Sequence, residues 1–102
     1  MNIISRKRLK LFGKHHPDAV RPLELWYRTV KRARWLHLHD VRRIYPHADP
    51  VTVASGNTVT VFNIAGNKYR LIAALHYNIQ RVYVLTLLTH AEYSKDEWKD
   101  SL

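Results

Sequence analysis

The sequence predicts one α+β domain, and three observations support this class. Its 102 residues, of which 46% are hydrophobic, suffice for one compact core and leave no room for a second folded domain, so residues 1–102 are assigned to one unit. Apolar residues recur with helical spacing in the first third of the chain. The C-terminal half contains β-branched and aromatic segments separated by turn signals. Two helices followed by an antiparallel sheet define the α+β class.

The N-terminal segment is expected to begin as a strand and to continue as a helix. Residues 2–4 are predicted to form a short strand. Ser5 is placed to cap a helix that runs to about Lys14. The segment His15–Asp18, which contains a proline, is expected to end that helix.

A second helix is predicted from Asp18 or Pro22 to about Ala33. Apolar residues recur there at i, i+3, i+4, i+7 and i+10 and form one stripe for the core: Leu23, Trp26, Tyr27, Val30 and Ala33. The other face is basic, and it carries Arg28, Lys31, Arg32 and Arg34.

The segment from residue 35 to residue 57 carries mixed signals. Residues 37–39 alternate as in a strand, whereas residues 40–45 suit a helical turn. Residues 48–50 and 55–57 are predicted to be loops, because each contains turn-forming residues.

The C-terminal half is predicted to form a meander followed by a short helix. Three segments are predicted strands: residues 58–64, 67–75 and 81–89. Their links, a turn at Ala65-Gly66 and a loop around Asn78, are short, so neighbouring strands are expected to be antiparallel. Residues 94–100 are predicted to form a short helix capped by Ser94.

Strand alternation places several polar side chains on one face of this sheet. With Ala65-Gly66 as a two-residue turn, Asn63 pairs with Lys68, and both share a face with Arg70. A second hairpin of matching parity puts His90 on the same face, just past the end of its strand. The opposite face is expected to supply the core with Phe62, Tyr69, Leu71, Ala73, Leu75, Tyr83 and Leu85. An odd-length change at either turn would reverse this assignment.

Positive charge is concentrated in the first half of the chain. Residues 1–50 hold twelve Lys and Arg against four Asp and Glu, a local +8, whereas residues 51–102 hold five against four, a local +1. This excess favours a polyanionic partner, which can be RNA, DNA or an acidic protein. The absence of cysteine excludes disulfides, Cys-ligated zinc and thiol catalysis. The chain has no 18-residue apolar run and no secretory signal, so a cytoplasmic protein without a membrane partner is expected.

A ribonuclease that uses neither a metal nor another cofactor needs few side chains, and the sequence contains them. The 2′-OH of RNA attacks the phosphate, a base accepts its proton, an acid protonates the leaving 5′-oxygen, and cations stabilise the phosphate. The candidates are Arg70 and Lys68 for the phosphate, His90 for proton transfer, Tyr93 as a second hydroxyl, and Asn63 or Asn67 to orient the substrate. Such residues also occur as solvated groups on ordinary sheet faces, and that alternative stays open.

The sequence argues against a metal site. His37 and His39 would point the same way on a strand, with Asp40, His15 or His16 as a third ligand. No HExxH motif, cysteine or carboxylate cluster supports this arrangement, and a two-metal nuclease needs several carboxylates. No metal is therefore predicted.

The basic helical face allows two interpretations. Its four cations can bind RNA phosphates: Arg28, Lys31, Arg32 and Arg34. They can equally form a solvated face with partial ion pairing, for example between Glu24 and Arg28 at i,i+4.

Two long motifs lie near the C-terminus: VFNIAGNKYRLI at residues 61–72 and LTHAEY at residues 88–93. They resemble the HigB family, toxins of bacterial type II toxin–antitoxin modules within the RelE-like group. Shorter matches are His16–Ala19, Trp26, Asp40-Val41 and Tyr45–Ala48, so the resemblance extends over roughly residues 3–99.

The resemblance implies a RelE-like fold, with two N-terminal helices on an antiparallel sheet. It implies an mRNA endoribonuclease that acts on ribosomes, inhibits translation and growth, and is neutralised by a cognate antitoxin. That antitoxin is expected to contain a helix-turn-helix and to be the link to operator DNA. By motif position, Arg70 matches the family's phosphate-binding arginine, and His90 and Tyr93 match the histidine and tyrosine of its THxEY motif; relatives vary at Lys68.

A non-catalytic binder of the same fold is the competing class. RelE-like folds include toxins that poison DNA gyrase by protein contact, and a basic domain can simply bind rRNA. The combination of His90 and Tyr93 with Arg70 favours the nuclease, because a pure binder needs no proton-transfer group.

Overall fold

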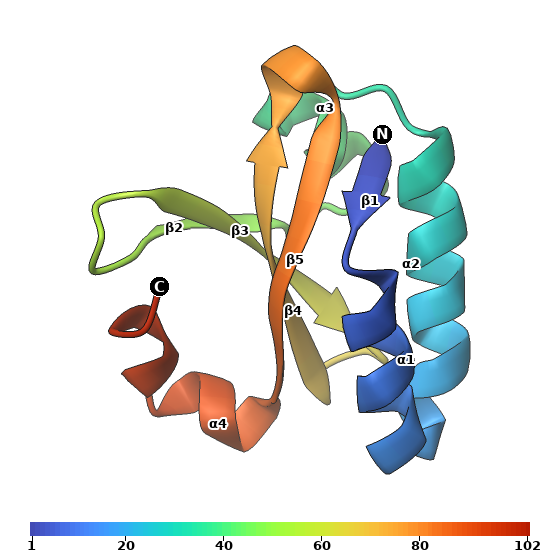
Figure 1. Ribbon diagram of the computed structural model, residues 1–102, viewed down its shortest axis with the longest axis vertical. Coiled ribbons are helices and arrows are strands. Elements are labelled where there is room, and N and C mark those ends of the chain that lie inside the picture. The colour runs from blue at the N-terminus through green and yellow to red at the C-terminus, as the bar shows by residue number, and fades with distance from the viewer.

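Four helices and five strands make up the chain, and the computed structural model describes all 102 residues (Figure 1). In chain order they are β1 (Asn2–Ile4), α1 (Arg6–His15), α2 (Val20–Arg32), α3 (Leu38–Ile44), β2 (Asp49–Thr52), β3 (Thr58–Ile64), β4 (Tyr69–His76), β5 (Arg81–Thr89) and α4 (His90–Ser94). Single 3₁₀ turns cover Pro17–Ala19, Tyr77–Ile79 and Glu97–Lys99. The predicted α+β class is confirmed.

The five strands form one sheet in the order β1-β5-β4-β3-β2. The predicted antiparallel meander of β3, β4 and β5 is confirmed, and β2 adds to it antiparallel at one edge. At the other edge β1 pairs in parallel with β5, so the sheet is mixed. The N-terminal strand and the last strand are therefore neighbours, and α1 begins beside the C-terminal half of the chain.

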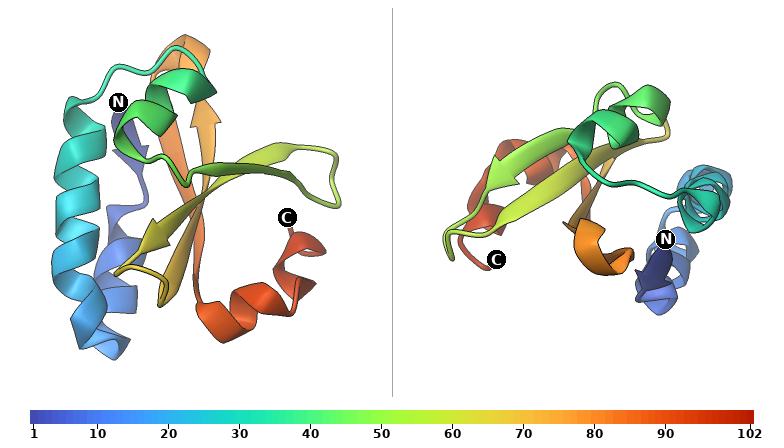
Figure 2. Two further views of the ribbon diagram at one scale, coloured as in Figure 1. Left: turned by 180° about the vertical axis from the view of Figure 1, so that it is seen from behind. Right: turned by 90° about the horizontal axis from the view of Figure 1, so that it is seen from above.

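Helices α1 and α2 lie side by side on one side of the sheet (Figures 1 and 2). The predicted stripe of α2 is confirmed at Leu23, Trp26 and Val30, which are buried. Pro22 is the third residue of α2. The N–H groups of the first helical turn have no carbonyl partner within the helix, so a proline there costs no hydrogen bond. The N-terminal ammonium donates to the carbonyl of Ala33 at 2.6 Å, at the other end of the helix.

Ser5 does not cap α1 with its side chain, so that prediction is wrong. The residue has φ 82° and ψ 50°, the left-handed region, and its hydroxyl makes no capping hydrogen bond. The chain turns sharply here between β1 and α1, and this turn requires a backbone conformation different from that of a side-chain cap.

Apolar side chains form two clusters, one on each face of the sheet. The larger cluster lies between the helices and the sheet and includes Trp26, Val30, Phe62 and Leu71. The smaller one lies on the opposite face, where Trp98 from the C-terminal segment covers strand residues such as Ile72. The view from above shows this segment and the helices on opposite sides of the sheet (Figure 2).

The middle of the chain contains one helix and one strand. The helical interpretation of residues 40–45 is confirmed by α3, and the alternative strand at residues 37–39 is wrong. The loop predicted at residues 48–50 is also wrong, because β2 begins at Asp49 and includes Pro50. A proline is tolerated there because β2 is an edge strand with one unpaired side.

The prediction of a helix over residues 94–100 capped by Ser94 is wrong. Helix α4 ends at Ser94, and its N-cap is Thr89, whose hydroxyl accepts the N–H of Glu92 at 3.2 Å. The Glu92 carboxylate accepts the N–H of Thr89 at 2.9 Å, which completes a capping box. Ser94 therefore closes this helix, and a single 3₁₀ turn follows it.

A β-bulge changes the pairing of β4 with β5. Arg70 pairs with Leu88, but beyond the irregularity at Ile72/Ala73 the partner of Ala73 is Val84. The extra residue reverses the alternation of β5, so Val82 and Val84 face the helices. The prediction that Tyr83 and Leu85 belong to that core is therefore wrong; Leu85 packs against the smaller cluster.

None of the helices combines the length and the apolar character that a membrane crossing requires.

Candidate functional site

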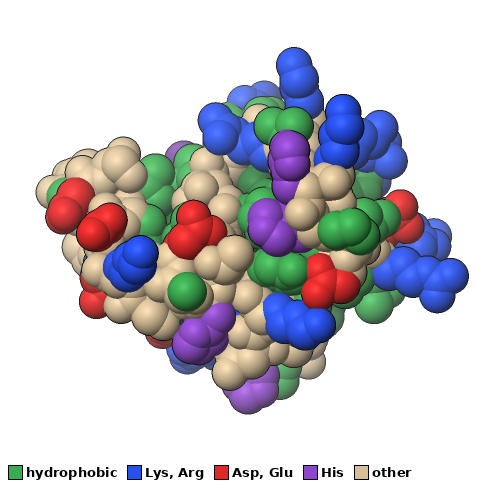
Figure 3. All heavy atoms as spheres, turned by 90° about the horizontal axis from the view of Figure 1, so that it is seen from below, with side chains coloured by type: hydrophobic (Ala, Val, Ile, Leu, Met, Phe, Trp, Pro, Cys, Tyr) green, Lys and Arg blue, Asp and Glu red, His purple; other side chains and the backbone are tan.

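The predicted polar residues gather at one end of the sheet, where the β3–β4 turn meets the junction of β5 and α4. The turn has four residues rather than two, because Ile64 pairs with Tyr69 and Asn63 pairs with Arg70. A lengthening by two residues keeps the parity, so Asn63 and Arg70 share a face as predicted. Figure 3 looks onto this end, where histidine, basic and acidic side chains lie close to one another.

Arg70 is the central cation of this end. Its side chain lies on the face opposite the helices and is 8% exposed. One guanidinium nitrogen donates to the carbonyls of Asn67 at 3.2 Å and of Tyr69 at 3.1 Å, and the other donates to Asn67 Oδ1 at 2.6 Å. These contacts use three of the five N–H donors of a guanidinium.

The charge of Arg70 is not balanced by the protein. Its hydrogen-bond acceptors are neutral amide oxygens, and none of the ion pairs of the structure includes it. A guanidinium removed from water without a carboxylate is costly unless an anion completes its contacts. Two free N–H donors and an unpaired charge make this position suitable for phosphate.

Tyr93 of α4 packs against this cation. The guanidinium carbon of Arg70 lies 5.3 Å from the centre of the Tyr93 ring, a cation–π distance. The Tyr93 ring also stacks on Trp98, with ring centres 5.4 Å apart. The indole N–H of Trp98 in turn donates to the carbonyl of Tyr93 at 3.2 Å. The C-terminal segment thus fixes an aromatic wall beside Arg70.

His90 is the first residue of α4, and its side chain is exposed. Its backbone N–H donates to the carbonyl of Lys68 at 2.9 Å, which ties the start of α4 to the β3–β4 turn. Its Nδ1 lies 3.5 Å from Ser94 Oγ, one turn later in the helix. An exposed imidazole on a capped helix start is available to a ligand at this end of the sheet.

Lys68 lies in the turn, and the prediction that it shares a face with Arg70 is wrong. The longer turn removes it from the strand, and its ammonium is 3.1 Å from Asp18 Oδ2. The hydroxyl of Tyr69, on the helix-facing side, donates to Asp18 Oδ1 at 2.6 Å. The ammonium is therefore directed to the Tyr69 side of the sheet, away from Arg70.

Asp18 joins the helical layer to the turn that carries the site. Its hydrogen bonds with Tyr69 and Lys68 hold the pKa of its carboxyl below the ordinary value. The same carboxylate raises the pKa of the Tyr69 phenol. Residue-by-residue interpretation missed Asp18, although it lies in the matched segment His16–Ala19; a lone carboxylate between two helices gives no signal of a partner fifty residues away.

The two asparagines take different positions. Asn67, in the turn, binds Arg70 through both its backbone and its side-chain oxygens. Asn63, at the end of β3, is exposed and pairs with Arg70 across the sheet. Both therefore lie next to the guanidinium, on elements that fix their backbones.

The predicted basic helical face is not part of this end of the sheet. Three of its residues line a groove between α1 and α2: Arg28, Lys31 and Arg32. Arg34 follows α2 and lies near the N-terminus of the chain. The sheet separates these four cations from Arg70, so the chain has two basic regions, and the RNA-binding role of the helical one stays a prediction.

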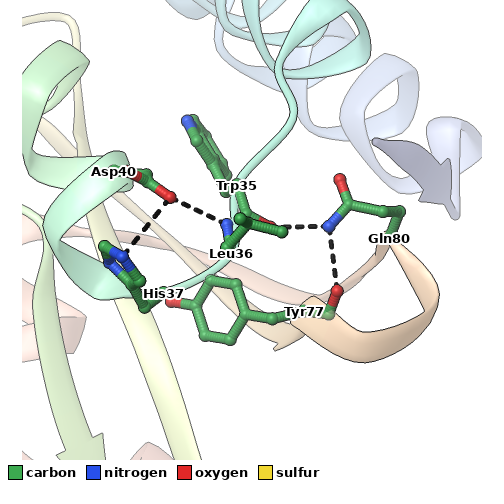
Figure 4. Close-up of polar contacts among 6 residues, drawn as sticks. All are labelled: Trp35, Leu36, His37, Asp40, Tyr77 and Gln80. Atoms are coloured by element: carbon green, nitrogen blue, oxygen red, sulfur yellow. Dashed lines mark hydrogen bonds and ion pairs between the residues drawn. The ribbon is translucent and has the colours of Figure 1, made fainter.

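His37, one of the histidines considered for metal binding, belongs to a structural junction (Figure 4). Asp40 accepts the N–H of Leu36 at 2.9 Å, and its carboxylate lies 3.8 Å from His37 Nε2. The amide of Gln80 donates to the carbonyls of Trp35 at 2.6 Å and of Tyr77 at 2.8 Å. These contacts join the α2–α3 link to the β4–β5 turn, and no group of three His, Asp or Glu side chains is arranged around a metal position.

Taken together, the end of the sheet presents a buried guanidinium, an amide, a phenol and an imidazole. The guanidinium and the amide suit an anionic oxygen, and the phenol and imidazole can move protons. Catalysis of phosphate chemistry on RNA requires these two functions.

The chain is similar to known toxins of toxin–antitoxin systems. Residues 19–96 match the family HigB_toxin, described as the RelE-like toxic component of a toxin-antitoxin system. The chain is 27% identical over 95 residues to the mRNA interferase HigB of Escherichia coli O6:H1, covering 93% of this chain and 90% of that protein. It is 25% identical over 93 residues to the mRNA interferase toxin HigB of Escherichia coli strain K12, covering 91% and 88% respectively.

Proposed function

The chain belongs to the HigB family of RelE-like toxins, and we propose that it is an endoribonuclease that cleaves mRNA on the ribosome and is neutralised by a cognate antitoxin. The observation that carries the enzymatic part is the buried guanidinium of Arg70, which binds neutral acceptors alone and keeps two N–H donors free. The relatives named mRNA interferases support the choice of RNA as the substrate.

The proposed reaction uses the 2′-OH of the substrate as the nucleophile. The 2′-oxygen forms a bond to phosphorus, the bond from phosphorus to the 5′-oxygen breaks, and a 2′,3′-cyclic phosphate and a 5′-OH result. One protein group accepts the proton of the 2′-OH, and another protonates the leaving 5′-oxygen. Negative charge builds up on the phosphate oxygens in between, where a preorganised cation stabilises it most.

Each residue of the site has a role in this scheme. Arg70 binds the phosphate and stabilises the charge that develops on it. His90 and Tyr93 are the candidates for the two proton transfers. Asn67 fixes the guanidinium, and Asn63 lies where it can orient the nucleotide. Lys68 receives no step, because its ammonium is paired with Asp18.

The decisive experiment examines the ends of the cleaved RNA. The purified chain is incubated with ribosomes on a defined mRNA, with magnesium kept at the level that the ribosome needs and a chelator of transition metals added. We expect cleavage that leaves 2′,3′-cyclic or 3′-phosphate ends, and no cleavage of the same mRNA without ribosomes. Recovery of 3′-hydroxyl ends would contradict the mechanism, and intact mRNA in growth-arrested cells would favour a non-catalytic binder.

A further inference from the structure

Three consecutive residues, Asn67, Lys68 and Tyr69, bind two groups of the proposed site through their carbonyls. The carbonyls of Asn67 and Tyr69 accept hydrogen bonds from the Arg70 guanidinium at 3.2 Å and 3.1 Å. The carbonyl of Lys68, between them, accepts the backbone N–H of His90 at 2.9 Å. The distance between the phosphate-binding cation and the residue that carries the imidazole therefore depends on the backbone of this tripeptide.

Two side chains of the same tripeptide connect it to the helical layer. One carboxylate oxygen of Asp18 accepts the Tyr69 hydroxyl at 2.6 Å, and the other lies 3.1 Å from the Lys68 ammonium. The tripeptide thus uses its carbonyls for the site and its side chains for Asp18. Each of the two site groups is connected to Asp18 through one intervening residue.

Asp18 is itself placed by rigid neighbours. It is the middle residue of the 3₁₀ turn Pro17–Ala19, between a proline, whose ring fixes φ, and an alanine that is fully buried. Its partner Tyr69 is 9% exposed, and the Tyr69 ring meets Phe12 of α1 edge to face at 5.3 Å. Both ends of the hydrogen bond between the carboxylate and the phenol are therefore fixed.

The β3–β4 turn depends on contacts from outside it. Ala65, its first residue, has φ 54°, in the left-handed region that an alanine adopts only where the surrounding structure imposes it. The hydrogen bond inside the turn, from the Lys68 N–H to the Ala65 carbonyl, is long at 3.4 Å. The two contacts of Asp18 hold the turn from outside, at the end where it enters β4.

The buried phenol is the stronger of these two contacts. The side chains of Lys68 and Asp18 are 66% and 46% exposed, and exposed ion pairs contribute little to stability. The Tyr69 hydroxyl instead donates a short hydrogen bond to a charged acceptor, which is stronger than one between neutral groups. The phenol therefore fixes the turn, and the ammonium adds a second point of contact.

We propose that Asp18 is a positioning residue for the reaction, which fixes the guanidinium of Arg70 and the backbone of His90 relative to each other. The inference rests on the proposed function, since this distance matters only where one substrate contacts both groups. Asp18 touches no substrate in this scheme, because it acts through the tripeptide. A displacement of about 1 Å can cost about 10²-fold in rate, so loss of Asp18 slows cleavage although every catalytic candidate is still present.

Single-turnover cleavage of ribosome-bound mRNA by Asp18→Ala tests the proposal, with the folded fraction measured by circular dichroism. We expect the rate per folded molecule to fall about tenfold or more, whereas the affinity for ribosomes stays within about twofold of the natural chain or increases. Affinity is not expected to fall, because the substitution removes a negative charge and frees the Lys68 ammonium.

Two further variants serve as controls. Asp18→Asn keeps an acceptor oxygen for the Tyr69 hydroxyl, so we expect it to lose less activity than Asp18→Ala. Asp49→Ala removes another exposed carboxylate, one that has no ion pair in the structure, and it should change the cleavage rate by less than about twofold.

Amide hydrogen exchange gives a measurement that does not depend on cleavage. In Asp18→Ala, exchange of the His90 N–H, which binds the Lys68 carbonyl, is expected to accelerate about tenfold relative to the amides of the central strand β4. A general loss of stability would accelerate both sets of amides alike.

The two measurements separate this inference from the proposed enzymatic activity. Cleavage by Asp18→Ala at the natural rate, a loss explained by weaker ribosome binding, or equal acceleration of all amides would overturn the positioning role. If the natural chain cleaves mRNA and exchange at His90 is unchanged in the variant, the enzymatic proposal stands and the positioning role fails. If the natural chain itself leaves mRNA intact, the enzymatic proposal fails, and selective exchange at His90 would still establish the connection from Asp18 to α4.

Discussion

At the scale of single residues, Arg70 contributes both to the local structure and to the proposed chemistry. Arg70→Lys keeps the charge but loses the planar group that binds Asn67 and Tyr69. We expect this variant to stay folded and to lose about two decades in cleavage rate, the effect of about 3 kcal/mol of transition-state stabilisation. Single-turnover cleavage of ribosome-bound mRNA measures the loss. A variant that cleaves as fast as the natural chain would show that a guanidinium is not required.

His90 provides a contrast, because its side chain is exposed. His90→Ala is expected to change the free energy of unfolding by less than about 0.5 kcal/mol. If the imidazole transfers a proton, cleavage falls about 10²–10⁴-fold. Urea titration and the cleavage assay on one preparation test both statements. Loss of soluble protein would show instead that His90 is structural.

Asp18 predicts a pH dependence of stability. The pKa of its carboxyl is lowered in the folded chain by hydrogen bonds with Tyr69 and Lys68, so the ionised form stabilises the fold. That contribution is complete above the unfolded pKa of about 3.9 and is lost as pH falls through the lower folded pKa. Asp18→Asn should therefore reduce stability at pH 7 and show a smaller further loss between pH 5 and pH 3.

Urea unfolding at pH 7, 5 and 3 measures this difference. Asp49→Asn is the control, because Asp49 is exposed and its side chain has no hydrogen bond or ion pair in the structure. Equal acid sensitivity of the natural chain and Asp18→Asn would contradict the prediction.

The positions of the site residues could be predicted where strand parity decides them. Asn63 and Arg70 share a face whether the turn has two residues or four, so the wrong turn length did not change the prediction for these two residues. Lys68 depended on the turn length itself, because the same error moved it from a strand into the turn. The burial of Arg70 under Tyr93 could not be predicted, since it depends on how α4 folds back over the sheet.

At the scale of elements, Trp26 packs α2 against the sheet. Its ring is 2% exposed and meets Phe62 edge to face at 5.5 Å, but its indole N–H has no hydrogen-bond acceptor. Trp26→Ala is expected to cost about 3–5 kcal/mol of stability. Trp26→Phe should cost less than about 1.5 kcal/mol, because it removes a buried unpaired donor that itself costs about 1–3 kcal/mol. Thermal and urea unfolding test the order; equal losses would contradict it.

Elements with strong local patterns could be predicted, and those set by long-range contacts could not. Strand β3 has the predicted bounds, because its β-branched and aromatic residues sit between clear turn signals. Strand β2 was missed because Pro50 is typical of loops, and its tolerance depends on an edge position that only the complete sheet defines. The bulge at Ile72/Ala73 left no signal, since no glycine or proline marks it.

At the scale of the whole molecule, the sheet separates two cationic regions with different surroundings. The one at Arg70 is a single buried guanidinium with aromatic and amide neighbours. The one along α1 and α2 is an exposed groove of six unpaired cations. Figure 3 shows Lys and Arg side chains gathered on the helical side and acidic ones toward the C-terminal segment. The region at Arg70 suits chemistry on one phosphate, and the region along α1 and α2 suits long-range attraction.

This charge separation predicts how antitoxin association responds to salt. Residues 1–50 carry a local charge of +8, so an acidic partner is attracted to the helical side before contact. Screening shortens the range of that attraction from about 10 Å at 0.1 M salt to about 3 Å at 1 M. The association rate constant should therefore fall steeply as salt rises, while the dissociation rate constant changes less. Stopped-flow mixing at several salt concentrations measures both. Lys10→Glu with Lys14→Glu should flatten the dependence, and an association rate indifferent to salt would show that the partner approaches another face.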